Sequence, residues 1–143
     1  MSDPEEVEVF GRRFLVTVTG PDAGRRYAAT IWEPAAGRTL TRSPVRGRSA
    51  AEVREKVVEV LHTLVGIDRA QEQILAVAAE LAPGASVELV EDAQAIRAML
   101  AGGWELAVPL ALPRDDVTDP EADIAALRRR IVDHFRAHLR RVR

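Results

Sequence analysis

The sequence predicts an α+β fold with the element order βββααβαβα. Two observations lead to this prediction. Apolar residues alternate with a period of two up to about residue 46, and from Ser49 to Gly66 they recur at helical spacing. We therefore expect a three-strand antiparallel meander packed on a helical hairpin, followed by a β-α-β unit and a long C-terminal amphipathic helix. The length of 143 residues predicts a single domain over residues 7–143.

The meander is indicated by alternating segments that are separated by turn residues. The three predicted strands cover residues 7–19, 25–33 and 38–46. Between the first two, Gly-Pro-Asp-Ala-Gly at residues 20–24 is typical of a turn, because Pro fixes φ and Asp can form an Asx turn. Pro44 lacks an amide hydrogen, so the third strand should end there or lie at an edge.

The clearest helix is predicted from Ser49 to Gly66. Ser49 and Glu52 match a capping box, and Gly66 suits the left-handed residue that ends a helix. A second helix is predicted from Asp68 to Ala82, where Pro83 and Gly84 stop it. The short connection between the two helices implies a hairpin. A sub-boundary of the domain is possible near residues 83–85.

The rest of the chain is predicted to alternate strands and helices. The predicted elements are a strand over residues 86–90, a helix over 93–101 capped by Asp92, and a strand over 104–112 interrupted by Pro109. If the two strands are neighbours in a parallel sheet, the crossover should be right-handed. The last helix should start at Pro120, with Asp119 as its N-cap, and run to the end of the chain.

One corner of the chain resembles a known family. The predicted strands followed by Gly-Arg-Ser-Ala-Ala-Glu-Val, residues 47–53, are similar to the strand-to-helix corner of HicB-type antitoxins. The resemblance covers about a third of the chain, and the additional DNA-binding module of that family is not evident. It implies a small β-meander and helix fold with RNA-related partners.

Composition limits the classes of function. The chain has no cysteine, which excludes a disulfide scaffold, thiol catalysis and a thiolate zinc site. The N-terminus does not have the pattern of a signal peptide, and no stretch is apolar enough for a membrane span, so we expect a cytoplasmic protein without a membrane partner. Residues 1–6 should form a flexible acidic tail.

Charge is unevenly distributed along the chain, although the net charge is only −2. Residues 11–48 carry eight arginines against two acids, and residues 125–143 carry seven arginines against one acid. Such basic segments attract polyanions, and arginine forks suit phosphate oxygens. The arginines predicted to contact RNA or DNA are Arg12, Arg13, Arg25, Arg26, Arg38, Arg42, Arg129, Arg136 and Arg140. Tyr27 and Trp32 are predicted to stack on bases. Arg46 and Arg48 follow on the third strand and its exit.

The alternative to a nucleic-acid surface is a set of arginines that complements the acidic middle segment and the end of the last helix. A second alternative is a protein-interaction or assembly subunit. In that case apolar helix stripes, including Ile131 and Phe135, would form a homodimer or contact a partner.

A weaker alternative is a metal-assisted enzyme. His134 and His138 have the i, i+4 spacing of a two-histidine metal site, but Phe135 stands where a zinc protease has its glutamate. The chain has no nucleophile elbow, P-loop or dinucleotide fingerprint. We therefore expect a non-catalytic binding or regulatory protein without a cofactor.

Overall fold

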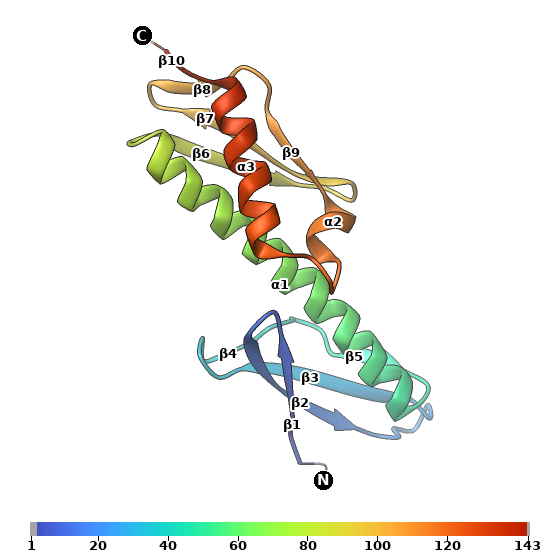
Figure 1. The fold of residues 1–143 in the computed structure, drawn as a ribbon. Coiled ribbons are helices and arrows are strands. Elements are labelled where there is room, and N and C mark those ends of the chain that lie inside the picture. The colour runs from blue at the N-terminus through green and yellow to red at the C-terminus, as the bar shows by residue number, and fades with distance from the viewer. Residues whose placement is uncertain (1–2, 143) are drawn as a thin grey trace. The chain divides into compact units, whose positions relative to one another are not determined.

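The computed structural model describes residues 3–142 (Figure 1). It contains ten strands and three helices in this part of the chain. In order, they are β1 (Glu5–Val9), β2 (Arg12–Thr19), β3 (Tyr27–Glu33), β4 (Arg38–Thr39), β5 (Val45–Gly47), α1 (Ala50–Leu81), β6 (Ser86–Glu91), β7 (Ala95–Ala101), β8 (Trp104–Leu106), β9 (Leu110–Pro113), α2 (Arg114–Thr118), α3 (Ile124–His138) and β10 (Leu139–Arg141). The α+β class with antiparallel sheets is confirmed.

The chain forms two compact units, the first ending at Val65 and the second beginning at Gly66. The division falls within α1, so each unit receives part of this helix. Each unit has its own apolar core.

The first unit is an antiparallel sheet with one face covered by the first part of α1. The strand order is β1-β2-β3-β4, and β5 also pairs with β3. Alternate residues of β2 and β3 point towards α1 and are buried, as period-two patterning requires. The core consists of Val9, Phe14, Val16, Val18, Ala29, Ile31, Val53, Val57, Leu61 and Val65.

The predicted first strand is in fact a hairpin. Phe10 and Gly11 both have positive φ, 50° and 80°, and form the two-residue turn between β1 and β2. Glu5 and Glu6 belong to β1, which corrects the expectation of a tail through residue 6. They are ordered because β1 pairs along its whole length with β2. Residues 1 and 2 lie outside the described part of the chain.

The capping box at the start of α1 is confirmed. The Ser49 hydroxyl accepts a hydrogen bond from the Glu52 amide at 3.1 Å, and the Glu52 carboxylate accepts one from the Arg48 amide at 3.0 Å. The predicted end at Gly66 is wrong, however, and so is the helical hairpin. α1 continues through Gly66 to Leu81 because apolar residues keep the same helical spacing beyond it.

The second unit is a three-stranded antiparallel sheet, β6-β7-β9, that packs on the second part of α1 and on α3. Residues 95–101 form a strand, so the predicted helix over 93–101 and the parallel β-α-β unit are wrong. Ile96, Ala98 and Leu100 alternate towards the core, a period of two that the helical interpretation overlooked. The core consists of Ile67, Ala70, Ile74, Val77, Ala78, Ile96, Ala98, Leu106, Leu110, Leu112, Val117, Leu127, Ile131 and Phe135.

The last helix is shorter than predicted at both ends. Its N-cap is Asp123, whose carboxylate accepts a hydrogen bond from the Ala125 amide, while Asp119 forms a separate turn with Glu121. α3 ends at His138 because Leu139–Arg141 form β10, which pairs with β8. The predicted strand over 104–112 is likewise divided into β8 and β9.

Candidate nucleic-acid interface

The turn between β2 and β3 is organised by Asp22. One of its carboxylate oxygens accepts hydrogen bonds from the backbone amides of Gly24 and Arg26, at 2.8 and 3.0 Å. The backbone amide of Asp22 donates in turn to the Arg26 carbonyl. The amide of Arg26 is the main cause that lowers the pKa of Asp22 below its ordinary value, and the charges of Arg46 and Arg26 contribute.

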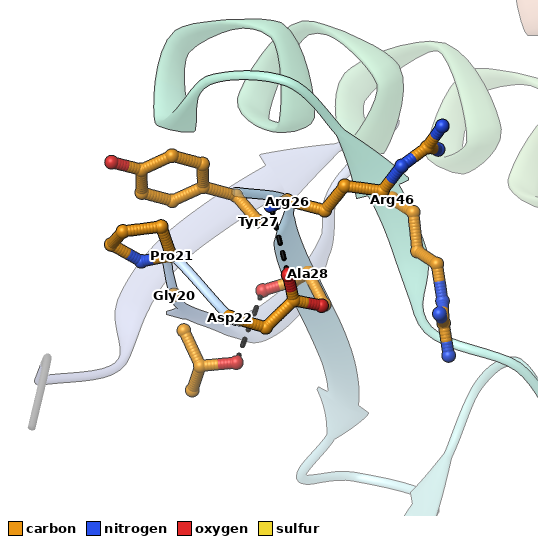
Figure 2. Close-up of a pocket in the computed structure, with 8 residues that line it drawn as sticks. Gly20, Pro21, Asp22, Arg26, Tyr27, Ala28 and Arg46 are labelled. Atoms are coloured by element: carbon orange, nitrogen blue, oxygen red, sulfur yellow. Dashed lines mark hydrogen bonds between the residues drawn. The ribbon is translucent and has the colours of Figure 1, made fainter. Parts of the chain in front are cut away.

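Arg46 lies beside this turn because β5 pairs with β3. Arg46 is directly opposite Ala28, and Gly47 is opposite Tyr27. A cavity of about 370 Å³ lies between the turn and β5, and Arg26, Tyr27 and Arg46 contribute to its lining. Figure 2 shows the Arg26 and Arg46 side chains extending to one side of this cavity, with Pro21 and the Tyr27 ring on the other.

Four exposed arginines therefore lie at one end of the first sheet. We call Arg25, Arg26, Arg46 and Arg48 the cationic cluster. Arg42, in the loop between β4 and β5, is also exposed. Within residues 3–142, none of these five side chains forms an ion pair with a carboxylate. Their charges are thus available to an external anion.

Trp32 lies on the outer face of the first sheet, which is the face turned away from α1. Its side chain is 43% exposed, and it stands opposite Leu15 of β2 and Thr39 of β4. Tyr27 is on the other face, half-buried, and packs against the core. Of the two predicted stacking residues, only Trp32 is on the outer face.

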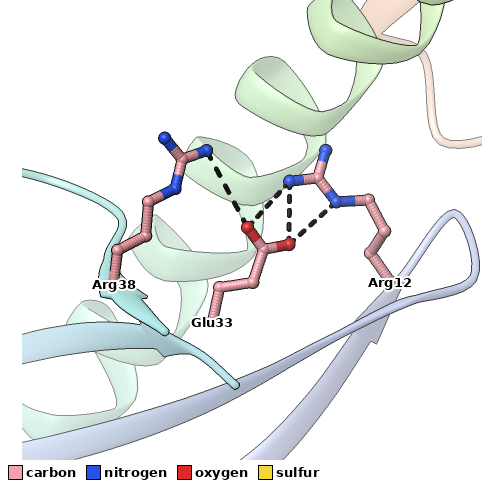
Figure 3. A network of polar contacts seen from close by, with 3 residues as sticks. All are labelled: Arg12, Glu33 and Arg38. Carbon is pink, nitrogen blue, oxygen red and sulfur yellow. Dashed lines mark hydrogen bonds and ion pairs between the residues drawn. The ribbon is translucent and has the colours of Figure 1, made fainter. Parts of the chain in front are cut away.

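The other predicted arginines of the first unit form ion pairs. Arg12 and Arg38 both approach the buried carboxylate of Glu33, at 2.8 and 3.9 Å (Figure 3). Arg13 pairs with Glu6 at 3.3 Å. No motif marked Glu33 as an ion-pair centre, because the sequence shows an acid next to a turn and not its burial at 5% exposure.

The remaining predicted arginines belong to the second unit. Arg129 and Arg136 are exposed on α3. Arg140 is on β10, where its guanidinium pairs with the carboxylate of Glu105.

The two histidines of α3 contact each other, with ring centroids 4.5 Å apart. Nε2 of His134 lies 2.8 Å from the Val108 carbonyl. A hydrogen bond there requires a proton on Nε2, which removes that nitrogen as a metal ligand. Among residues 3–142 no group of three His, Cys, Asp or Glu side chains could hold a metal ion. Neither observation supports a metal centre.

The apolar stripe of α3 is not available to a partner. Ile131 and Phe135 are completely buried in the core of the second unit. This corrects the expectation that they form an exposed assembly surface, because the sheet β6-β7-β9 and α1 already cover them.

No protein-family model matches the chain, and neither a curated protein nor a solved structure matches it. The resemblance of residues 47–53 to HicB-type antitoxins therefore stays a prediction. Among the described helices, none combines the length and the apolar character that crossing a membrane would require.

Proposed function

We propose that this protein is a non-catalytic binding protein for nucleic acid and that the first unit carries the interface. The supporting observation is the cationic cluster. Its four arginines are exposed and form no ion pair with any carboxylate of residues 3–142, and the same sheet exposes Trp32 on its outer face. Arginines that already pair with carboxylates contribute little to binding an anion, because the pair must first be broken. The free ones can contact phosphate oxygens directly.

The distribution of acids indicates which side of the first sheet a nucleic acid would contact. β1 is an edge of the first sheet and carries Glu5, Glu6 and Glu8. β5, which pairs with β3, carries Arg46 and leads directly to Arg48. A polyanion is repelled by the first side and attracted by the second, so it should contact β3 and β5.

The test is a fluorescence anisotropy titration with labelled RNA and DNA oligonucleotides, each offered single-stranded and as a duplex, at several salt concentrations. We expect affinity to fall steeply with salt, since bound phosphates release counterions. The double variant Arg26→Glu, Arg46→Glu should lose at least about tenfold in affinity. Arg97→Glu is the control for net charge: it reverses one charge in the second unit, at an exposed ion pair with Asp92, and its effect is compared with the loss per reversed charge in the double variant.

The proposal fails if neither RNA nor DNA of the same sequence binds at low salt, single-stranded or as a duplex, or if the double variant binds as tightly as the unchanged protein. A loss in Arg97→Glu that is as large, per reversed charge, as the loss in the double variant would show that net charge alone governs binding and would also contradict an interface at the cationic cluster.

A further inference from the structure

We infer that the ligand of the first unit is a single-stranded nucleic acid, with one base stacked on Trp32 and the backbone crossing β3 towards Arg46. This inference rests on the proposed function and specifies its substrate class.

The register of the sheet places the two groups on the same face. Trp32, Thr30 and Ala28 alternate with buried residues of β3, so all three point outwards. Arg46 is the direct neighbour of Ala28 on β5 and shares its face. Trp32 and Ala28 are four residues apart, or about 13 Å along an extended strand.

The surface between them suits an extended strand of nucleotides. Thr30 of β3 and its neighbour Thr17 of β2 lie between Trp32 and Ala28. Their side chains are small, carry hydroxyl groups that can donate to phosphate or sugar oxygens, and bring no negative charge. The acid beside Arg46 is Asp22, which lines the same cavity in the turn between β2 and β3. Glu6 of β1 lies beyond Leu15, on the other side from Arg46.

The exposed indole distinguishes a single strand from a duplex. Bases in a duplex are covered on both faces by their neighbours, whereas an aromatic ring exposed on the face of a sheet can stack an unpaired base. The free arginines bind phosphates of either form, so the charge alone makes no such distinction. Trp32 is the residue that should confer the preference.

The experiment uses the full chain and four oligonucleotides of one sequence: single-stranded RNA, single-stranded DNA and the two corresponding duplexes. Anisotropy titrations compare the unchanged protein with Trp32→Ala, Trp32→Phe and Arg46→Glu. Base stacking predicts that Trp32→Ala weakens single-strand binding about 5- to 100-fold and that Trp32→Phe restores most of it. Circular dichroism checks that each variant is folded, which is expected because Trp32 lies outside the core.

Tryptophan fluorescence provides a second measurement. The chain has two tryptophans, so Trp104→Phe leaves Trp32 as the only reporter. Added single strand should quench its emission, and the duplex should not. The titrations with RNA and with DNA show which of the two single strands the protein binds. Binding of either single strand supports the inference.

The outcomes separate the inference from the proposed function. Duplex binding as tight as single-strand binding, without an effect of Trp32→Ala, overturns the inference and leaves the proposed function standing. The absence of binding to all four oligonucleotides overturns both. Single-strand binding that is lost in Arg46→Glu but unchanged in Trp32→Ala overturns the stacking on which the inference depends.

Discussion

The guanidinium of Arg12 is bound to the buried carboxylate of Glu33 from the neighbouring strand. Nε and Nη2 of Arg12 donate to Oε2 at 3.0 and 2.8 Å, and Nη2 also donates to Oε1 at 3.0 Å. The same guanidinium lies 5.6 Å from the centre of the Phe14 ring. Arg12 therefore stabilises the end of the first sheet, and its charge is balanced within the protein.

We predict that Arg12→Ala destabilises the first unit by about 2–3 kcal/mol, because Glu33 would remain buried with its charge, which Arg38 approaches no closer than 3.9 Å. The partial exposure of Arg12 places the effect below that of a fully buried pair. Urea unfolding followed by circular dichroism measures it. The double variant Arg12→Leu, Glu33→Leu should regain most of the loss, since no buried carboxylate is then left without its partner and Arg38 is exposed.

Arg13→Ala is the matched control, one residue away. Its pair with Glu6 is more than half exposed on both sides, so its removal should cost less than about 0.5 kcal/mol. Equal losses for Arg12→Ala and Arg13→Ala would contradict the structural role assigned to Arg12.

For Gly66 we predict that alanine destabilises the protein, which is the opposite of what helix propensity alone predicts. Replacing a glycine inside a helix with alanine normally stabilises the protein by about 1 kcal/mol. Here a Cβ at position 66 would lie 2.3 Å from the Val117 carbonyl oxygen, which is backbone and cannot rotate away. We therefore expect Gly66→Ala to lower the stability of the second unit by about 1–3 kcal/mol, as overpacking does.

Thermal unfolding measures this effect, with Glu72→Ala as the control at an exposed position of the same helix. A higher melting temperature for Gly66→Ala would show that helix propensity outweighs the contact and that α2 can move away from α1.

The features that could be predicted from the sequence are those that depend on residues close together in the chain. The capping box at Ser49 and Glu52 and the alternation of β2 and β3 were predicted correctly, since each is a local pattern. Gly66 was misinterpreted because a glycine suits both a helix end and a close contact. Its neighbour Val117 is about fifty residues away in sequence, so only the tertiary structure decides between the two.

The strand at Ala95–Ala101 was mistaken for a helix for a similar reason. Ile96, Met99 and Leu100 fit helical spacing, but Ile96, Ala98 and Leu100 also fit a period of two. Pairing with β6 and β9 selects the strand. At the candidate interface, counting charges found the basic segment, but could not show that Arg12 and Arg38 are paired while Arg26 and Arg46 are not.

Glu52 should make the stability of the first unit depend on pH in the acid range. The hydrogen bond from the Arg48 amide, followed by that from Lys56, lowers the pKa of Glu52 below its ordinary value of 4.5. A lowered pKa means that the stabilisation is fully present above 4.5 and is lost as the pH falls through the folded-state value.

Glu52→Gln keeps an oxygen for the Arg48 amide but has no charge to lose. The unchanged protein should therefore melt at a higher temperature than the variant near pH 6, and the difference should close in strongly acidic buffer. Melting curves across this range measure it. A difference that stays constant with pH would mean that the charge of Glu52 contributes nothing.

Asp22 lies beside Arg26 and Arg46 of the cationic cluster, and its replacement should strengthen nucleic-acid binding. Because hydrogen bonds from the Arg26 and Gly24 amides, with the charges of Arg46 and Arg26, lower its pKa, Asp22 is ionised at neutral pH and repels phosphate. Asp22→Asn retains an oxygen that can accept both amide hydrogen bonds while it removes the charge. We expect the affinity for single-stranded RNA to rise about 2- to 5-fold at low salt and the gain to shrink at high salt.

Asp22→Ala is the control. It removes the same charge and also the hydrogen bonds of the turn, so its affinity should rise less than that of Asp22→Asn. Anisotropy titrations of both variants at two salt concentrations measure this, and an Asp22→Asn protein that folds normally but binds no more tightly would place the phosphates away from the turn between β2 and β3.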